Sequence, residues 1–369
     1  MANLQASTSL QYWVGFNLIP GIGPAKLKRL LDAFGDLELA WRCSSAELAR
    51  AGMDAKAVES IVYHRQKIDL TRQMEHIDRL GVDLLTWQDS RYPERLRHIY
   101  ASPPLLYVRG SLTPEDDWSV SVVGTRRASV YGRQCTEQIV AELARSRVTI
   151  VSGMARGIDS YAHKTCLQAG GRTIAVLGCG VDVVYPPENA RLMAEIIERG
   201  AVVSDYAIGT GPDGVNFPTR NRIISGLSLG TLVIEAGETS GALLTAAFAL
   251  DQGREVFAIP GRILDRTSKG TNRLIQQGAA KLVYCAQDVL EELNLSMVPQ
   301  QLEMREILPE NRTEEVLLGL LSTDPVHVDE MCRASGLPVA EVSSTLAMME
   351  LKGMVRQVGG MNYIAARPV

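Results

Sequence analysis

The sequence predicts an α/β protein built on an extended Rossmann-like, doubly wound parallel sheet. Three observations indicate this class. Short apolar runs recur through residues 118–294, glycines close most of these runs, and amphipathic helical patterns separate them. Apolar strands that alternate with amphipathic helices are typical of a parallel sheet covered on both faces.

The predicted strands end at seven places. These are Gly124, Gly153, Gly178, Tyr206, Gly237, Gly261 and Cys285. Helical patterns fill the intervals, namely Tyr131–Arg145, Ile158–Ala169, Pro187–Arg199, Pro218–Ser228, Ser240–Gln252 and Thr271–Gly278. Each interval is long enough for the crossover that joins two parallel strands.

Residues 1–80 are predicted to form a helical domain of the helix-hairpin-helix (SAM-like) kind. Gly21 and Gly23 permit a tight turn, and Pro24 suits the first turn of the helix that follows. Such a glycine turn can hold a nucleic-acid phosphate through its backbone N–H groups, or the hairpin serves only packing and protein contacts. Both interpretations stay open on sequence alone.

Three further segments complete the predicted organisation. Residues 81–117 are expected to be a connector with short strands, and residues 295–310 a polar linker. Residues 311–369 are predicted to form a winged helix, with three helices at Glu314–Leu321, Val328–Ala334 and Val339–Lys352 and a β-ribbon after them. The third helix carries few cations for reading DNA, so a protein-contact role is favoured.

Bulk composition limits the classes of function. The chain has 369 residues and a net charge of -4, which argues against a uniformly basic nucleic-acid binder. Six cysteines without CxxC spacing indicate free thiols in a reducing compartment. The beginning of the sequence lacks the pattern of a signal peptide, and no apolar run is long enough to span a membrane. A cytoplasmic protein without membrane contact is therefore expected.

Two glycine loops at strand ends predict an anion site. The first is Gly124-Thr125-Arg126-Arg127, and the second runs from Ser152 to Asp159 with Gly153 and Arg156 inside it. Backbone N–H groups at a helix start attract anions, and arginine suits bidentate phosphate contacts. Both loops follow parallel strands, so we expect them to open at one edge of the sheet.

Two more segments are expected at the same edge. One is Asn216–Arg222, which includes Phe217, and the other is Glu235–Thr245. An exposed Phe217 ring can stack on a base, although a ring that merely covers the helix start is equally common. The alternative for the arginines is solvated surface or ion pairs with nearby aspartates.

Several enzyme signatures are missing from the sequence. No G-x-G-x-x-G follows the first core strand, no P-loop or G-x-S-x-G occurs, and the histidines lack metal-ligand spacing. No metal or cofactor is expected. Glu235 and Glu238 are candidates for acid or base in N-glycosidic cleavage of a nucleotide, or alternatively for helix capping.

These motifs resemble the DNA-processing protein A (DprA/Smf) family. The resemblance rests on Gly124–Arg126, Ser152–Asp159, Phe217–Ser228 and Glu235–Thr245, and it covers nearly the whole chain. It implies a non-enzymatic protein that binds and protects single-stranded DNA in natural transformation and helps load RecA recombinase. It also implies a homodimer formed through the Rossmann core.

The resemblance and the loop pattern together give a set of predicted DNA-binding residues. They are Gly124, Thr125, Arg126, Ser152, Gly153, Arg156, Lys164, Phe217, Arg220, Asn221, Arg222, Ser240 and Gly241. The alternative function is a phosphoribohydrolase-like nucleotide-processing enzyme on the same Rossmann variant. Ser228–Glu235 resembles the signature of those enzymes but lacks their paired glycines.

Overall fold

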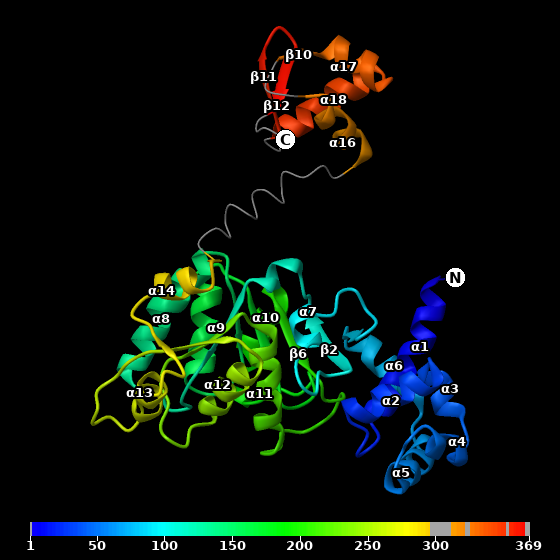
Figure 1. Ribbon diagram of the computed structural model, residues 1–369, viewed down its shortest axis with the longest axis vertical. Helices are drawn as coiled ribbons and strands as arrows, with labels where there is room; N and C mark the ends of the chain where they lie inside the picture. The colour runs from blue at the N-terminus through cyan, green and yellow to red at the C-terminus, as the bar shows by residue number, and fades with distance from the viewer. Residues whose placement is uncertain (1, 296–310, 322–324, 352–353, 366–369) are drawn as a thin grey trace. The chain divides into compact units, whose positions relative to one another are not determined.

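The computed structural model places the chain in two compact units, Met1–Ser296 and Met297–Val369 (Figure 1). The structure describes residues 2–295, 311–321, 325–351 and 354–365. The predicted linker at residues 295–310 therefore lies outside the described residues, apart from Leu295. No helix in these described stretches is long and apolar enough to cross a membrane.

A nine-stranded sheet forms the centre of the larger unit, with the strand order β1-β2-β6-β5-β4-β3-β7-β8-β9. Its strands are β1 (Asp83–Thr86), β2 (Leu105–Gly110), β3 (Ser119–Val123), β4 (Thr149–Ser152), β5 (Thr173–Val176), β6 (Ala201–Ser204), β7 (Gly230–Val233), β8 (Glu255–Ala258) and β9 (Lys281–Leu282). All pairs from β6 to β9 are parallel. The predicted doubly wound, mostly parallel sheet is confirmed.

Helices cover both faces of this sheet. The helices and 3₁₀ turns after β2 are η1 (Pro114–Asp117), α8 (Val130–Arg145), α9 (Ile158–Gln168), η2 (Pro187–Asn189), α10 (Ala190–Arg199), α11 (Asn216–Leu227), α12 (Gly241–Asp251), α13 (Lys269–Gln276) and α14 (Ala286–Glu292). Helices α9 and α10 share one apolar core, and α11 and α12 pack into the other. The predicted helix bounds agree within about two residues because buried strands and amphipathic helices have distinct apolar periods.

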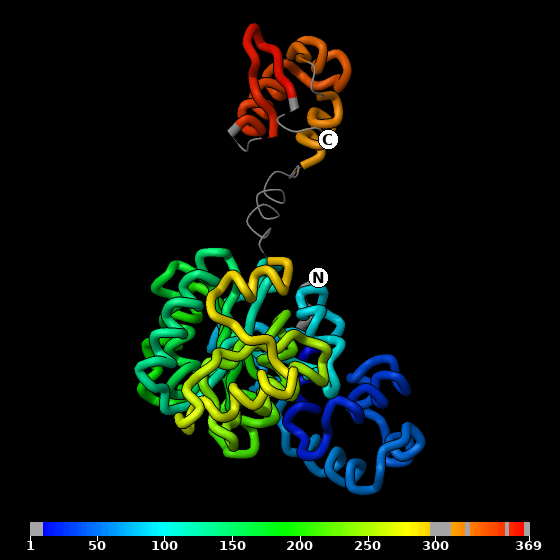
Figure 2. Tube along the Cα trace, turned by 60° about the vertical axis from the view of Figure 1, so that its left-hand side comes forward, coloured from blue at the N-terminus to red at the C-terminus, as the bar shows by residue number. Residues whose placement is uncertain are grey.

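Six N-terminal helices pack against one end of this core (Figure 2). They are α1 (Ala2–Asn17), α2 (Pro24–Phe34), α3 (Leu37–Arg42), α4 (Ser45–Arg50), α5 (Ala55–Arg65) and α6 (Leu70–Arg79). As predicted, Pro24 opens α2, which buries Leu27 and Leu30. The buried residues of these helices join the core cluster that also contains sheet residues. Asn17 adds polar anchors, since it accepts from the Tyr107 hydroxyl at 3.1 Å and donates to the Asp205 carbonyl at 3.2 Å.

The segment predicted as a connector, residues 81–117, extends the sheet. Strand β2 pairs antiparallel with β6, β1 pairs antiparallel with β2, and α7 (Glu94–Arg97) packs against α11. Both short strands were expected from their apolar composition. Their place at the edge of the large sheet depends on long-range pairing, which apolar composition does not encode.

The smaller unit is a winged helix, as predicted. It contains α16 (Arg312–Gly319), β10 (Val326–His327), α17 (Val328–Ser335), α18 (Val339–Leu351), β11 (Val355–Gly359) and β12 (Asn362–Ala365). The three strands form one sheet in the order β10-β12-β11. A separate apolar core built on Leu317, Met331 and Leu346 holds the helices together. Lys352, predicted at the end of α18, lies outside the described residues.

The antiparallel edge supports a stability prediction at Gly110, the last residue of β2. Gly110 has φ +87°, and a Cβ atom there would lie 2.3 Å from the Gly200 carbonyl oxygen. Gly170 has φ +79° with no atom within 4 Å of such a Cβ atom. Left-handed backbone costs a non-glycine residue about 1 kcal/mol, and overpacking adds roughly 2 kcal/mol. Gly110→Ala should therefore destabilise the larger unit by about 2 kcal/mol more than Gly170→Ala.

Denaturant unfolding of both variants beside wild type measures this difference. Equal losses of unfolding free energy in the two variants would show that the junction of β2 with β6 tolerates the added methyl group, contrary to the close approach of the two backbones.

Candidate nucleic-acid interface

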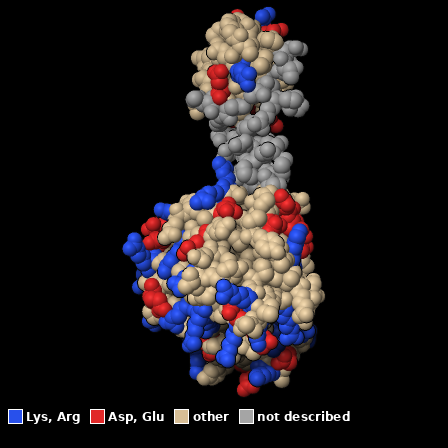
Figure 3. All heavy atoms as spheres, turned by 90° about the vertical axis from the view of Figure 1, so that its left-hand side faces the viewer, with Lys and Arg blue, Asp and Glu red and all other residues tan. Residues whose placement is uncertain are grey.

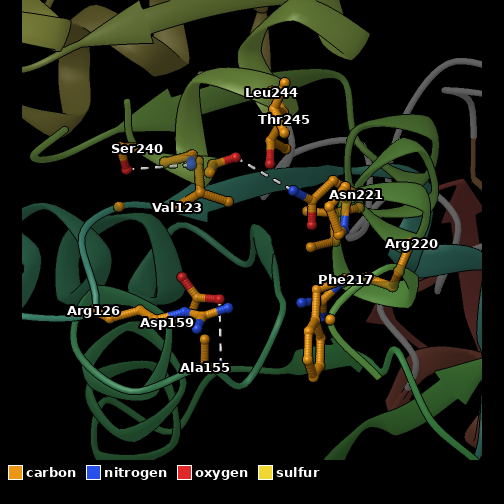
Figure 4. A pocket seen from close by; sticks show the side chains of 16 residues that line it. Val123, Arg126, Ala155, Asp159, Phe217, Arg220, Asn221, Ser240, Leu244 and Thr245 are labelled. Carbon is orange, nitrogen blue, oxygen red and sulfur yellow. Dashed lines mark hydrogen bonds between the residues drawn. The ribbon is translucent and has the colours of Figure 1, made fainter. Parts of the chain in front are cut away.

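A cavity of about 320 Å³ opens at the carboxyl edge of the sheet (Figure 4). Loops after β3, β4 and β7 and the start of α11 line it. Strands β3 and β7 are neighbours, yet the chain leaves them toward opposite ends of the sheet. This is the topological switch point, where ligands of open α/β sheets bind. The prediction that these loops meet at one edge is confirmed.

The first glycine loop places Arg126 in the cavity wall. Gly124 lies against Ile158, and a Cβ atom on Gly124 would be 2.5 Å from that side chain. The Thr125 N–H donates to the Glu235 carbonyl oxygen at 2.8 Å, which fixes the loop to the end of β7. Arg126 follows directly, and its exposed side chain extends into the cavity (Figure 4).

An aromatic stack faces Arg126. The Arg126 guanidinium carbon lies 5.7 Å from the centroid of the Phe217 ring, within the range of a cation–π contact. The Phe217 and Tyr185 rings are stacked, with centroids 5.4 Å apart and an interplanar angle of 23°. Gly178 allows this arrangement, because a Cβ atom there would approach the Phe217 ring to 2.8 Å. The site therefore combines a cation with an aromatic platform.

Arg220 forms the floor of the cavity. It is 4% exposed, and its guanidinium donates to the Gly153 carbonyl at 2.9 Å and also to the Val176 carbonyl. Its Nε atom has no hydrogen-bond partner within the described part of the chain. Burial lowers the pKa of Arg220, while the nearby Asp159 carboxylate opposes that shift. The result is a buried cation with an unused donor beneath the cavity.

Asp159 occupies the N–H groups that the second loop was expected to offer to a phosphate. Its carboxylate accepts from the Ala155 N–H at 3.4 Å and also interacts with the backbone of Gly153. Burial raises the pKa of Asp159 to about 6, although Arg220 and these backbone groups favour the charged form. The loop thus carries its own anion, which lies in the cavity wall beside Arg126 and Arg220 (Figure 4).

A shallower depression adjoins the cavity and shares Arg126, Phe217 and Arg220 with it. Gly153 and Arg156 line this second part. Gly153 packs on the Arg220 guanidinium, where a Cβ atom would be 2.5 Å from a nitrogen. The exposed Arg156 pairs with Glu188 through contacts of 2.5 and 3.1 Å. Exposed pairs of this kind contribute little stability, so Glu188 holds Arg156 only weakly.

The last predicted segment forms the opposite wall. Ser240 accepts from the Ala242 N–H at 3.3 Å and so caps α12. The Asn221 amide donates to the Gly241 carbonyl at 3.4 Å, which joins α11 to the start of α12. All three predicted residues, Asn221, Ser240 and Gly241, line the cavity.

Four predicted site residues line neither hollow, and the structure gives three of them another role. Thr125 uses its backbone to fix the loop, and Ser152 is buried with its hydroxyl donating to the Val122 carbonyl at 2.6 Å. Arg222 is 8% exposed and pairs with Asp205 at 2.6 Å, as the ion-pair alternative anticipated. Lys164 is exposed on α9 but lies outside the cavity lining.

Sequence reasoning did not include Tyr185 and Asp159 among the site residues. Tyr185 lies in the loop after β5, the next parallel strand of the sheet. Because loops after parallel strands lie at the carboxyl edge, the sequence could have indicated Tyr185 as a site residue. Asp159 stands at the start of α9, where the sequence indicates its carboxylate only as a possible arginine partner. No cluster of metal-ligating side chains occurs within the described residues.

Comparison with known proteins identifies the family of this chain. Residues 83–294 match the family described as DNA recombination-mediator protein A, and residues 303–361 match the DprA winged helix domain. Protein Smf of Synechocystis is 33% identical across 97% of this chain and 99% of its own. Protein Smf of Escherichia coli is 41% identical across 75% of each chain. The chain belongs to the DprA/Smf family.

Two solved structures share this fold. The X-ray structure of DNA processing protein A from Streptococcus pneumoniae is 36% identical, covers 76% of this chain and 97% of its own, and has a TM-score of 0.68. DNA processing protein A from Helicobacter pylori, described for its single-stranded DNA binding mode, is 30% identical with a TM-score of 0.52. That match covers 57% of this chain and 95% of the other.

The internal anion gives a pH prediction. Because the pKa of Asp159 is raised to about 6, its carboxyl becomes protonated as the pH falls from 7.5 to 5, and negative charge leaves the cavity. Anion affinity should therefore rise severalfold over this range in the wild-type protein. Asp159→Asn should bind more tightly at pH 7.5 and show a flatter pH profile.

Fluorescence anisotropy with labelled oligothymidylate at constant ionic strength measures both effects. Every other group is identical in the two proteins, so a difference between their pH profiles comes from position 159. Parallel pH profiles for wild type and Asp159→Asn would show that another group is responsible.

Proposed function

We propose that this protein binds single-stranded DNA without strong sequence preference, with one backbone phosphate in the cavity beside Arg126 and Arg220. The observation that carries the proposal is the meeting of these two cations with the Phe217–Tyr185 stack. Arginines contact phosphates, and aromatic rings stack on any base, so the combination fits a nucleic acid with unpaired bases. The single-stranded DNA binding described for the Helicobacter pylori relative supports the same ligand.

Charge distribution agrees with a local anion site. The net charge is -4, yet Lys and Arg side chains gather on the lower part of the face shown in Figure 3. Local positive patches attract a polyanion even when the whole chain is acidic. In the winged helix, the described part of α18 exposes Glu341 and Glu350 and no lysine or arginine. That unit suits a protein partner better than a duplex groove.

The role we propose is non-enzymatic. In the alternative, a phosphoribohydrolase-like enzyme, Glu235 would act as acid or base at the cavity. Its buried carboxylate instead accepts from the Ser129 N–H at 2.9 Å, the Ser129 hydroxyl at 2.6 Å and the Thr267 hydroxyl at 3.2 Å. Glu238 is exposed and does not line the cavity. Neither glutamate is placed to meet a ligand held by Arg126.

The family resemblance supports the wider role. We propose that the protein protects incoming single-stranded DNA in the cytoplasm during natural transformation and helps load RecA recombinase. We also propose a homodimer through the Rossmann core.

Removal of the Arg126 side chain tests the site. Arg126→Ala should weaken oligothymidylate binding by at least about tenfold, which corresponds to about 1.4 kcal/mol. The slope of log affinity against log salt should fall by about 0.7, the value for one phosphate on a single strand. Arg145→Ala, an exposed arginine at the last turn of α8, should leave both quantities unchanged.

A salt-dependent mobility-shift assay with single- and double-stranded DNA measures these values. Equal binding by Arg126→Ala and wild type would exclude this cavity as the phosphate site. Release of free base from nucleoside monophosphates by wild-type protein would instead favour the enzymatic alternative.

The aromatic platform gives a second prediction. Phe217→Ala should reduce the binding free energy by about 1–3 kcal/mol, the range for one base stacked on an aromatic ring. Phe217→Tyr retains the ring and should bind within about twofold of wild type. Anisotropy titrations of the two variants at one salt concentration test this expectation. If Phe217→Ala binds as tightly as Phe217→Tyr, the ring serves only to cover the start of α11.

A further inference from the structure

A basic groove of about 510 Å³ runs along α6 and the turn that joins it to α5. We call it the α6 groove. Its cationic and titratable lining comprises His64, Lys67, Arg72, His76 and Arg79, with Asp69 as its acidic member. Neither the DNA-binding motifs nor the glycine hairpin of the sequence includes this surface. Helices α5 and α6 are drawn in blue in Figure 1.

Helical spacing explains why these side chains gather. Arg72, His76 and Arg79 follow one another at i, i+4 and i+7, which places them on one face of α6. All three are exposed, while Ile77 on another face is buried in the core. The fold of α6 therefore fixes a basic row on its outer surface.

In the part of the chain that the structure describes, the long cations of the α6 groove have no acidic partner. Within the described residues, no carboxylate forms an ion pair with Lys67, Arg72 or Arg79. The Asp69 carboxylate accepts from the Arg72 backbone N–H at 3.0 Å and caps α6. Lys67 instead lies over the Tyr63 ring, 3.9 Å from its centroid.

Some other surface arginines of this chain do pair with a neighbouring carboxylate. Arg42 pairs with Glu38 at 2.7 Å, and Arg91 pairs with Asp83 at 2.5 Å. A row of unpaired cations on a chain of net charge -4 creates a local positive potential that attracts anions. The length of the row suits a polyanion better than a single small ion.

Packing connects the α6 groove to the aromatic platform of the cavity. Leu18 and Ile68 line the groove, and both pack against the same apolar cluster as Tyr185, the stacking partner of Phe217. Asn17, next to Leu18, donates to the Asp205 carbonyl directly after β6. The N-terminal helices are thus anchored to the sheet edge that carries the cavity.

We propose that the α6 groove is a second contact site for the nucleic-acid backbone, which binds phosphates of the strand held at the cavity. The inference rests on the proposed function, because the strand first binds beside Arg126. It adds phosphate contacts from the N-terminal helices, through Lys67, Arg72 and Arg79, beyond those of the Rossmann core. Longer strands reach both sites and shorter ones only the cavity.

The test compares strand lengths in the full-length chain. Arg72→Glu/Arg79→Glu should bind an oligothymidylate of roughly 6 nucleotides as wild type does, and one of roughly 16 nucleotides at least about tenfold more weakly. For the longer strand, the salt slope should fall by about 1.4, the value for two lost phosphate contacts. Arg29→Glu/Arg50→Glu makes the same charge change on exposed arginines of α2 and α4 outside the groove, and should retain wild-type affinity.

Thermal unfolding confirms that each variant is folded, and Arg72→Gln/Arg79→Gln tests the loss of contacts without added repulsion. Equal affinity of the groove variants and wild type for the longer strand would overturn the inference. So would an equal loss in the Arg29→Glu/Arg50→Glu control, because the effect would then be general charge. Failure of the proposed function has a different result: wild type would not bind the short strand, or Arg126→Ala would bind it unchanged.

Discussion

The burial of one guanidinium, that of Arg220, is the constraint on which the rest of the site depends. A buried cation requires compensating acceptors, and here the carbonyl groups of Gly153 and Val176 supply them. These two residues lie at the ends of neighbouring strands, so the contacts hold the floor of the cavity to β4 and β5. This contact requires glycine at position 153, because the side chain of a larger residue would displace the Arg220 guanidinium.

The electrostatic balance of the cavity comes from Asp159. Without it, Arg126 and Arg220 would face each other as like charges in a partly enclosed space. With it, these three side chains carry a net charge of about +1 when Asp159 is ionised, which a phosphate would balance. The pKa of Asp159 is raised because the carboxyl is buried. The positive charge of the cavity favours the binding of an anion. A phosphate that is part of a continuous strand fits this site, because the strand can continue outside the cavity.

Much of the fold followed from the sequence because buried strands and amphipathic helices have distinct apolar periods. The meeting of the Gly124 and Ser152 loops was predictable for the same reason, since parallel strands end at one edge. The ion pair of Arg222 with Asp205 and the stack of Tyr185 on Phe217 join segments far apart in the chain. Such side-chain pairs depend on how the segments pack against each other. A motif within one segment therefore does not predict them.

The antiparallel edge illustrates the same limit. Residues 105–108 had the composition of a strand, but their partner could be known only once β6 was placed. Through β2 and Asn17, the N-terminal helices are attached to the same sheet whose carboxyl edge carries the cavity.

In the binding mode that we propose, a DNA phosphate lies between Arg126 and Arg220, and a base stacks on the Phe217–Tyr185 platform. A crystal structure of the protein with a short oligothymidylate tests it most directly. We expect a phosphate oxygen within hydrogen-bond distance of Arg126 and a thymine ring stacked beside Phe217. A strand bound elsewhere on the surface, with no phosphate at this cavity, would contradict it.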